Sequence, residues 1–369
     1  MNSTQVTWLP EHPTTGSMSM QRYWRLLEGA IQAEDPFECS SIFPPDKGET
    51  VRRSGTMTRY LARQFCYPAK IKFQAKGEIV HVLDHSWAEM LRFTPRHALK
   101  VVTVHDLIPL RFPGELTPAQ SQRFRCRVEN LTKADAIIAD SAYTKLEIQE
   151  LLGIDGSKIH VVLLGVKLPE EMNSPSPFPQ RQDNDTHFRI GSIGNTLERK
   201  NLAILPEALV RLQASVRRKV VLVRVGGMLP ASLAAAVRAE LGENGLIELG
   251  DVPDNAIPGY YADLDALVVP SLYEGFGLPV LEGMAARVPV VSSNSTSLPE
   301  VGGENVLYFD PTDPDALAHQ LAVVAENRLP EDWTDLAYER AKGFSWRKTL
   351  EGIYDVYQGA MDQRSRRSV

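Results

Sequence analysis

Short apolar runs rich in β-branched residues recur along the sequence, each ending in polar residues or glycine and followed by a longer segment of helical periodicity. This alternation predicts strand–helix units around parallel sheets, because parallel strands need a long crossover that is usually a helix. The sequence therefore predicts an α/β fold with two doubly wound sheets. The expected strands are residues 6–9, 79–83, 101–104, 136–139 and 159–164 in the first half, and 189–193, 220–225, 246–249, 266–269, 288–292 and 306–309 in the second.

The length and one polar segment indicate two domains. With 369 residues the chain exceeds one ordinary core and suits two α/β domains of roughly 150 to 200 residues each. Residues 169–185 are too polar and proline-rich for packed strand–helix structure, so we expect the linker there. The first domain should cover 1–170, with an amphipathic helix at 347–369 packing back on it, and the second should cover 186–346.

Charge and cysteine content exclude several classes of protein. The chain has 40 Lys and Arg against 46 Asp and Glu, a formal net charge of −6, so we expect no nucleic-acid partner. Cys39, Cys66 and Cys126 lie far apart without a C-x-x-C pair, which gives no readable disulfide framework or cysteine zinc site. There is no recognisable signal peptide and no apolar run of the ~18 residues that span a bilayer, so the sequence predicts a cytoplasmic protein.

A local basic segment, residues 50–76, runs against this acidic balance. It carries seven cations and no acid, with apolar side chains between them. Such a segment could attract an anionic leaflet and place the protein peripherally at the inner membrane face, near a lipid-linked acceptor. An exposed helix with solvated cations explains it equally well. The cations are Arg52, Arg53, Arg59, Arg63, Lys70, Lys72 and Lys76.

The strongest chemical signal follows the predicted strand 266–269. The sequence there is Glu-Gly-Phe-Gly-Leu-Pro-Val-Leu-Glu over residues 274–282, with a helix expected from about Pro279. Backbone N–H groups at the start of a helix favour an anion such as a diphosphate. Glu274 and Glu282 beside such an anion are suited to accept hydrogen bonds from sugar hydroxyls. The pattern predicts a sugar nucleotide site, whereas isolated glutamates would more simply be surface acids.

The whole second half resembles the retaining glycosyltransferases of family 4, which have the GT-B architecture. The resemblance rests on the Glu-x7-Glu motif, the following Val-Pro-Val-Val-Ser, the Leu-Pro-Glu-Val-Gly-Gly at 298–303 and the Phe-Asp-Pro at 309–311. It implies that Glu282 binds the nucleotide ribose and that Glu274 lies against the donor sugar. It also implies that the backbone between them holds phosphate and sugar oxygens, at Gly275, Phe276, Gly277 and Leu278.

Two further segments of the second half fit this resemblance. Strand 189–193 leads into Gly194 and then the Arg199-Lys200 pair, which would bring fixed positive charge to a leaving diphosphate. Many relatives carry another arginine directly after the glycine, where this chain has Asn195. The resemblance also implies that residues after strand 246–249 touch the base, and Val252 is the candidate there.

The first half contributes His105 and Asp106 at the carboxyl end of strand 101–104. The segment His-Asp-Leu-x-Pro resembles that of family members, many of them mannosyltransferases, in which the histidine approaches the donor sugar. We expect His105 to orient the donor sugar and form hydrogen bonds with it, and we do not assign it the role of a base that abstracts a proton. Gly16, after the first strand, is what remains of the family's usual glycine pair.

Together these features predict a two-domain GT-B enzyme that transfers a hexose, with retention, from a nucleotide diphosphate sugar to an acceptor hydroxyl in cell-surface polysaccharide or glycolipid synthesis. His105 favours GDP-mannose as donor, with a UDP-sugar second. No Asp-x-Asp segment is placed to hold a metal, so we expect neither metal nor other cofactor. A non-catalytic sugar-nucleotide-binding protein and an epimerase of similar architecture remain alternatives. The acceptor, a saccharide or a lipid-linked saccharide, is not encoded in any recognisable motif.

Overall fold

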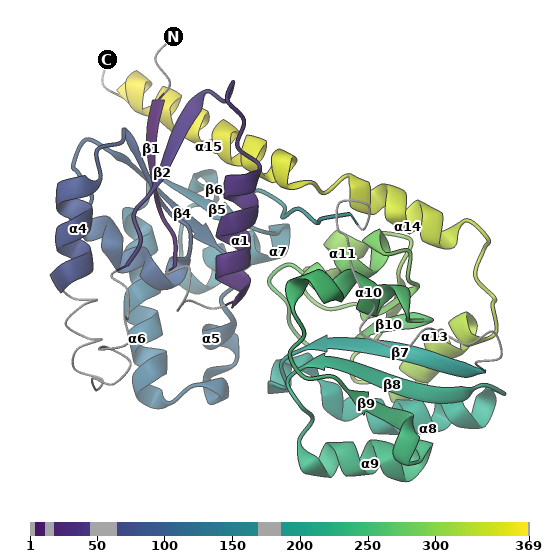
Figure 1. Cartoon of the computed structure of the whole chain (residues 1–369). Coiled ribbons are helices and arrows are strands. Elements are labelled where there is room, and N and C mark those ends of the chain that lie inside the picture. Colours follow the sequence, from purple (N-terminus) through teal and green to yellow (C-terminus); the bar gives the residue numbers. More distant parts are fainter. Residues whose placement is uncertain (1–3, 12–17, 45–64, 169–185, 368–369) are drawn as a thin grey trace. The chain divides into compact units, whose positions relative to one another are not determined.

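The computed structural model describes residues 4–11, 18–44, 65–168 and 186–367. The chain forms two compact units, one comprising Met1–Gly165 with Trp346–Val369 and the other Val166–Ser345. Each unit is built on a six-stranded sheet (Figure 1). All the recorded strand pairs are parallel, which confirms the predicted α/β fold with two doubly wound sheets. The linker expected at 169–185 lies outside the described residues.

The first sheet has the strand order β2-β1-β3-β4-β5-β6. Its strands are β1 (Thr4–Leu9), β2 (Phe37–Ser41), β3 (Ile79–Val82), β4 (Leu99–Val104), β5 (Ala136–Ala139) and β6 (Ile159–Val161). One face is covered by α4 (Tyr67–Gln74), η2 (His85–Phe93), α6 (Pro118–Val128), η4 (Glu129–Lys133) and α7 (Ala142–Leu152). The other face carries α15 (Trp346–Arg367), which contacts β4, β5 and α1 (Met18–Gly29).

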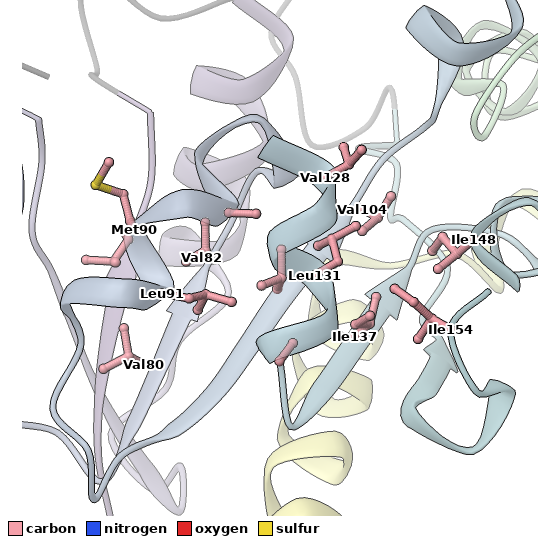
Figure 2. Packing of buried hydrophobic residues seen from close by; sticks show 14 of the residues in the cluster. Val80, Val82, Met90, Leu91, Val104, Val128, Leu131, Ile137, Ile148 and Ile154 are labelled. Carbon is pink, nitrogen blue, oxygen red and sulfur yellow. The ribbon is translucent and has the colours of Figure 1, made fainter. Parts of the chain in front are cut away.

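Side-chain alternation along the strands gives the sheet two buried faces, one lined by an apolar cluster and the other by apolar side chains together with His81 and Thr103. Val80, Val82 and Val104 point into the cluster formed with α6, η2 and α7 (Figure 2). His81 and Thr103, at the alternate positions, therefore point to the opposite face, where α15 packs. The continuous apolar cluster explains why these strands read as short β-branched runs in the sequence.

A buried chain of hydrogen bonds attaches α15 to the first sheet. The Trp8 indole N–H donates to the Tyr357 hydroxyl oxygen at 3.0 Å. His81 Nδ1 lies 2.6 Å from the Tyr357 hydroxyl oxygen and His81 Nε2 lies 2.8 Å from Thr103 Oγ1, so both ring nitrogens are within hydrogen-bond distance of a hydroxyl. Burial, and then the charge of His105, lower the pKa of His81 to about 3, so this imidazole stays neutral.

The second sheet has the order β12-β11-β10-β7-β8-β9. Its strands are β7 (His187–Gly194), β8 (Lys219–Gly226), β9 (Leu246–Glu248), β10 (Ala266–Val269), β11 (Val290–Ser293) and β12 (Leu307–Phe309). The helices α8 (Leu205–Ser215), α9 (Ala231–Leu241) and α13 (Pro314–Ala325) share one apolar core with it. On the other face α11 (Leu278–Ala285) packs closely on Leu267 and Val290 at Gly283.

The predicted runs all form strands, with ends shifted by a few residues, but the sequence missed β2. This strand, Phe-Glu-Cys-Ser-Ser, pairs only with β1 at the edge of its sheet and buries only part of its length. An edge strand needs no continuous apolar run, so its sequence carried no signal. Within the described part of the chain, no helix has the length and apolar character needed to cross a membrane.

The strand order identifies where the second unit can bind a ligand. β7 lies between β8, the next strand in the chain, and β10, so the direction of winding reverses between β7 and β10. Open parallel sheets bind ligands outside the carboxyl ends of the strands at such a switch point. The loops after β7 and β10 carry Lys200 and Glu274.

Candidate active site

Glu274 lies in the loop between β10 and α11, and the residue is only 8% exposed. Its carboxylate oxygen Oε1 accepts a hydrogen bond from the Lys200 ammonium at 2.6 Å and another from the Ser271 hydroxyl at 2.7 Å. Among the described residues Oε2 has no hydrogen-bond partner. This oxygen can therefore accept a hydroxyl of a ligand while Oε1 remains held.

The charge of Lys200 decides the protonation of this carboxylate. Burial alone would raise the pKa of Glu274, but the charge and hydrogen bond of Lys200, the hydrogen bond of Ser271 and the charge of Arg199 hold it below its usual value of 4.5. Glu274 is therefore ionised at neutral pH despite its burial. The structure brings the predicted residues Glu274, Lys200 and Arg199 together.

Asn201 fixes the segment that carries Arg199 and Lys200. It adopts a left-handed conformation with φ 52°, which asparagine tolerates better than most residues. Its side-chain amide donates to the carbonyl oxygens of Pro270 and Pro311, at 3.1 and 2.7 Å. The loop after β7 is thus tied to the loop after β10, which fixes the distance between Lys200 and Glu274.

Two hydroxyls after β11 hold the backbone around Glu274. Thr296 Oγ1 accepts a hydrogen bond from the Glu274 N–H and donates to the Glu274 carbonyl oxygen, both at 3.1 Å. The Ser297 hydroxyl lies 2.9 Å from both the Glu274 and the Phe276 carbonyl oxygens. These contacts constrain the loop that leads into α11.

The helix α11 begins at Leu278, one residue before the predicted start. Gly277 precedes it with φ 105°, and a Cβ there would lie 2.7 Å from the Leu298 side chain, so the position requires glycine. The Phe276 ring is buried and contacts Phe344 edge to face, at 6.3 Å between centroids. Gly275 lies in the loop directly before it. The predicted backbone site at 275–278 therefore begins a well-packed helix.

Glu282 lies one turn into α11, as predicted, but its hydrogen-bond partner was not foreseen. The hydroxyl of Tyr261, in α10 (Ile257–Ala262), donates to Glu282 Oε2 at 2.9 Å. Tyr261 is buried, so it holds this carboxylate in one orientation. A glutamate oriented in this way could accept hydrogen bonds from the two hydroxyl groups of a ribose.

The remaining predicted residues of the second unit lie at the same edge of the sheet. Gly194 ends β7 with φ 121°, and a Cβ there would lie 3.7 Å from Lys200 Cε. Asn195 follows, exposed, and its side-chain oxygen accepts a hydrogen bond from the Leu197 N–H at 3.3 Å. Val252 is half-buried in the loop after β9. No contact of the structure tests its role toward a base.

His105 and Asp106 belong to the first unit, at the carboxyl end of β4. The Asp106 carboxylate accepts a hydrogen bond from the Ile108 N–H at 3.0 Å and so caps the short helix α5 (Ile108–Arg111), a local structural role. Gly16 lies outside the described residues. Site residues are thus predicted in both units.

Both ring nitrogens of His105 are engaged by protein acceptors. Nδ1 lies 2.6 Å from the Asp140 carboxylate and Nε2 lies 2.9 Å from the Leu83 carbonyl oxygen. Burial alone would lower the pKa of His105, but the charge and hydrogen bond of Asp140, the charge of Asp84 and the Leu83 carbonyl raise it from 6.5 to about 9. The residue is therefore an imidazolium that donates from both nitrogens and cannot act as a base in this state.

This raised pKa predicts a pH dependence of stability. Because the folded pKa lies above the unfolded value, the stabilisation by His105 is complete below pH 6.5 and is lost as the pH rises through about 9. The loss should be on the order of 3 kcal/mol in the free energy of unfolding. Urea unfolding at a series of pH values should show this decline for the wild type and a flatter profile for His105→Gln.

A matched control is His319→Gln, at an exposed histidine of α13, which should leave the alkaline decline unchanged. Asp140→Asn should reduce the decline in the same way as His105→Gln, because it removes the charge that raises the pKa. An identical alkaline profile for the wild type, His105→Gln and Asp140→Asn would contradict the assignment of a charged His105.

Comparisons with known proteins identify the family of the chain. Residues 175–340 match the family described as Glycosyl transferases group 1, and residues 39–169 match Glycosyltransferase Family 4. O-antigen chain mannosyltransferase B of Escherichia coli is 32% identical over 269 residues, which cover 70% of this chain and 70% of that protein. The serotype-specific mannosyltransferase WbdA of Escherichia coli is 28% identical over 290 residues, 71% of this chain but only 34% of WbdA.

Solved structures share the fold at low sequence identity. A sucrose-phosphate synthase from Thermosynechococcus elongatus superposes with a TM-score of 0.71 at 18% identity, covering 98% of this chain and all of that one. HepE from Anabaena, solved with UDP and glucose, gives a TM-score of 0.71 at 16% identity over 96% of this chain and 100% of its own. From the matched profiles, the E. coli relative and the shared GT-B fold, the chain belongs to glycosyltransferase family 4.

Proposed function

We propose that the chain transfers mannose from GDP-mannose to a hydroxyl of a saccharide acceptor, with retention at the anomeric carbon. The observation that carries the proposal is the contact between Lys200 and Glu274 at the switch point of the second sheet, 2.6 Å between Nζ and Oε1. We assign the Lys200 ammonium to the phosphates and the Glu274 carboxylate to the sugar hydroxyls, and the contact supports this because the two groups lie side by side. The similarity to two mannosyltransferases supports mannose, and the O-antigen relative supports surface polysaccharide synthesis.

The charges of the site suit the breaking of a glycosyl–diphosphate bond. Lys200, with Arg199 beside it, would balance the negative charge that grows on the leaving diphosphate oxygen. When phosphate draws Lys200 away, Glu274 remains held by Ser271 and can accept a hydroxyl of the sugar. Glu282, oriented by Tyr261, would accept from the ribose.

Retention follows if both exchanged groups use the same face of the sugar. The bond between the anomeric carbon and the diphosphate oxygen breaks, and the acceptor oxygen forms its bond on that face. The acceptor proton then passes to the departing diphosphate oxygen, so no protein base is required. This fits His105, whose two nitrogens already donate to Asp140 and Leu83, and which can contribute only charge and position.

Donor identity is testable by titration. Isothermal calorimetry should show tighter binding of GDP than of UDP, and NMR of the product should show the anomeric configuration of the donor. Turnover should persist in EDTA, since Lys200 and Arg199 are proposed to supply the positive charge at the phosphates. Preference for UDP would instead favour a UDP-sugar donor, which HepE, solved with UDP and glucose, makes the second candidate.

Replacing the carboxylate that faces the sugar should affect turnover more than nucleotide binding. We expect Glu274→Gln to lower kcat by roughly 100-fold, because the neutral amide loses charge-assisted hydrogen bonds formed in the transition state. Its Kd for GDP should change less than threefold, an estimate based on Glu282 and the phosphate contacts remaining intact.

The control for this variant is Glu243→Gln, at an exposed glutamate of η9 (Glu243–Gly245) in the same unit, which should match the wild type. Unchanged transfer by Glu274→Gln would remove the proposed role of Glu274. Donor isomerised without acceptor would indicate an epimerase, and donor bound without any turnover would indicate a binding protein.

We also propose that the basic segment 50–76 brings the chain to an anionic membrane, near a lipid-linked acceptor. Residues 50–64 lie outside the described part. In the remainder, Phe73 of α4 is 77% exposed and Phe65 is 65% exposed, with Lys72 and Lys76 close in sequence. Exposed aromatic rings beside lysines are suited to the interface of a bilayer.

Phe73→Ser should weaken sedimentation with phosphatidylserine vesicles at low salt by about threefold, since one interfacial side chain is lost. Leu336→Ser, at a half-exposed leucine of α14 (Trp333–Lys342), is the control. Failure of the wild type to bind these vesicles would remove the membrane proposal and leave the transfer reaction untouched.

A further inference from the structure

Arg224 is a buried cation that the mechanism above does not use. It lies in β8, where it is the one charged residue within the otherwise apolar run Val-Val-Leu-Val-Arg-Val, and it is only 1% exposed. Burying a charge is costly unless an opposite charge or strong hydrogen bonds compensate for it. The presence of an arginine there calls for a physical reason.

The acceptors of the Arg224 guanidinium are all neutral. Nη1 donates to Ser192 Oγ at 3.0 Å, and Nη2 donates to the carbonyl oxygens of Gly194 and Gly227, both at 2.9 Å. Among the described residues Nε has no hydrogen-bond partner. The guanidinium is thus held in place by hydrogen bonds but not neutralised by them.

Glu248, whose charge acts on Arg224, forms its hydrogen bonds with other residues. Glu248 accepts hydrogen bonds from the Leu229 N–H at 2.7 Å and from Arg238 at 3.4 Å. Burial lowers the pKa of the Arg224 guanidinium, and the charges of Tyr260 and Glu248 only act against this effect. Among the described residues no acidic side chain forms an ion pair or hydrogen bond with Arg224, so its positive charge is unpaired.

The carbonyls that Arg224 binds belong to two adjacent glycine turns. Gly194 ends β7, and Gly226 and Gly227 end β8. Gly226 has φ 99°, and a Cβ there would lie 2.5 Å from the Gly194 carbonyl oxygen, so the two turns are in contact. The Gly227 N–H also donates to that oxygen, at 3.1 Å. Lys200 flanks Gly194 at its Cα, so the first turn lies between two cations.

Peptide geometry then directs two N–H groups outward. In a trans peptide the C=O and the following N–H point in opposite directions. Because the Gly194 and Gly227 carbonyls point inward to Arg224, the N–H groups of Asn195 and Met228 point away from it. Neither N–H has a hydrogen-bond partner within the described chain. A cation on the carbonyl also polarises the attached N–H and strengthens it as a donor.

We propose that Arg224 is a positioning residue for the donor diphosphate, which it favours by orienting and polarising the Asn195 and Met228 amides and by its own buried charge. The proposal rests on the proposed function, since it assumes a nucleoside diphosphate at this edge of the sheet. Many relatives carry an arginine where this chain has the uncharged Asn195. In the proposal, Arg224 supplies part of the positive charge that such an arginine would bring. Arg224 itself need not touch the ligand.

Calorimetric titration with GDP and guanosine, and with UDP and uridine, separates this role from a merely structural one. Arg224→Met should weaken binding of the diphosphate that the wild type prefers by about tenfold and of its nucleoside by less than twofold, because only the phosphates respond to the lost charge. Arg224→Lys should weaken the diphosphate by about threefold, since the charge is kept but the planar fork is lost.

Arg218→Met is the matched control, because Arg218 lies before the other end of β8 and pairs with Asp265 at 3.1 Å. It should leave the ratio of nucleoside to diphosphate Kd unchanged. Should Arg224→Met fail to fold, the ratio in Arg224→Lys decides. The amide shifts of Asn195 and Met228 on adding pyrophosphate to the wild type give an independent measurement, and both are expected to move.

The inference would be overturned if both Arg224 variants kept the wild-type ratio of nucleoside Kd to diphosphate Kd, whether or not both affinities fell. The proposed function would then still stand. Unmoved Asn195 and Met228 amides in pyrophosphate would also overturn the inference. Absence of any nucleoside diphosphate binding by the wild type would instead overturn the proposed function, and the inference with it.

Discussion

The partly buried contact between Lys200 and Glu274 is the interaction on which the candidate site depends. Their residues are 74 positions apart, in loops that leave β7 and β10. Either charge alone would be expensive at this depth, whereas together they hold both loops against the end of the sheet. Asn201, Ser271 and Ser297 then fix the backbone on each side. The site is therefore formed before any ligand arrives, which reduces the ordering that binding would otherwise require.

Three of the buried charges among the described residues are compensated in two different ways. Glu274 is matched by a lysine, His105 is matched by Asp140, and Arg224 is surrounded by neutral acceptors. Matched pairs fix geometry, because each charge finds its counterpart within the protein. An unmatched charge adds to the potential outside it. In our proposal, the unpaired charge of Arg224 contributes to ligand affinity although it is as deeply buried as the paired charges.

Much of the fold and part of the site could be predicted from the sequence. The apolar runs identified the strands because buried parallel strands are apolar on both faces. The motif at 274–282 identified the ligand-binding loop, because it lies between the end of a strand and the start of a helix and so must be at the carboxyl edge of the sheet. Edge strand β2 was missed because its burial is partial. Tyr261, Asp140 and Asn201 were missed because their importance arises from contacts with residues far away in sequence. Arg224 did leave a signal, a charge within an apolar strand, but its neutral acceptors become visible only in three dimensions.

The location of α15 has a consequence for biosynthesis. Tyr357 completes the hydrogen bonds of Trp8 and His81, yet it follows the whole second unit in the chain. A chain emerging from the ribosome can pair β1, β3 and β4 while these two buried groups still lack their partner, and they must wait for all of Val166–Ser345 to be synthesised. The first unit is thus the first to begin folding and the last to finish. Until then the surface that α15 covers in the finished fold stays exposed to solvent.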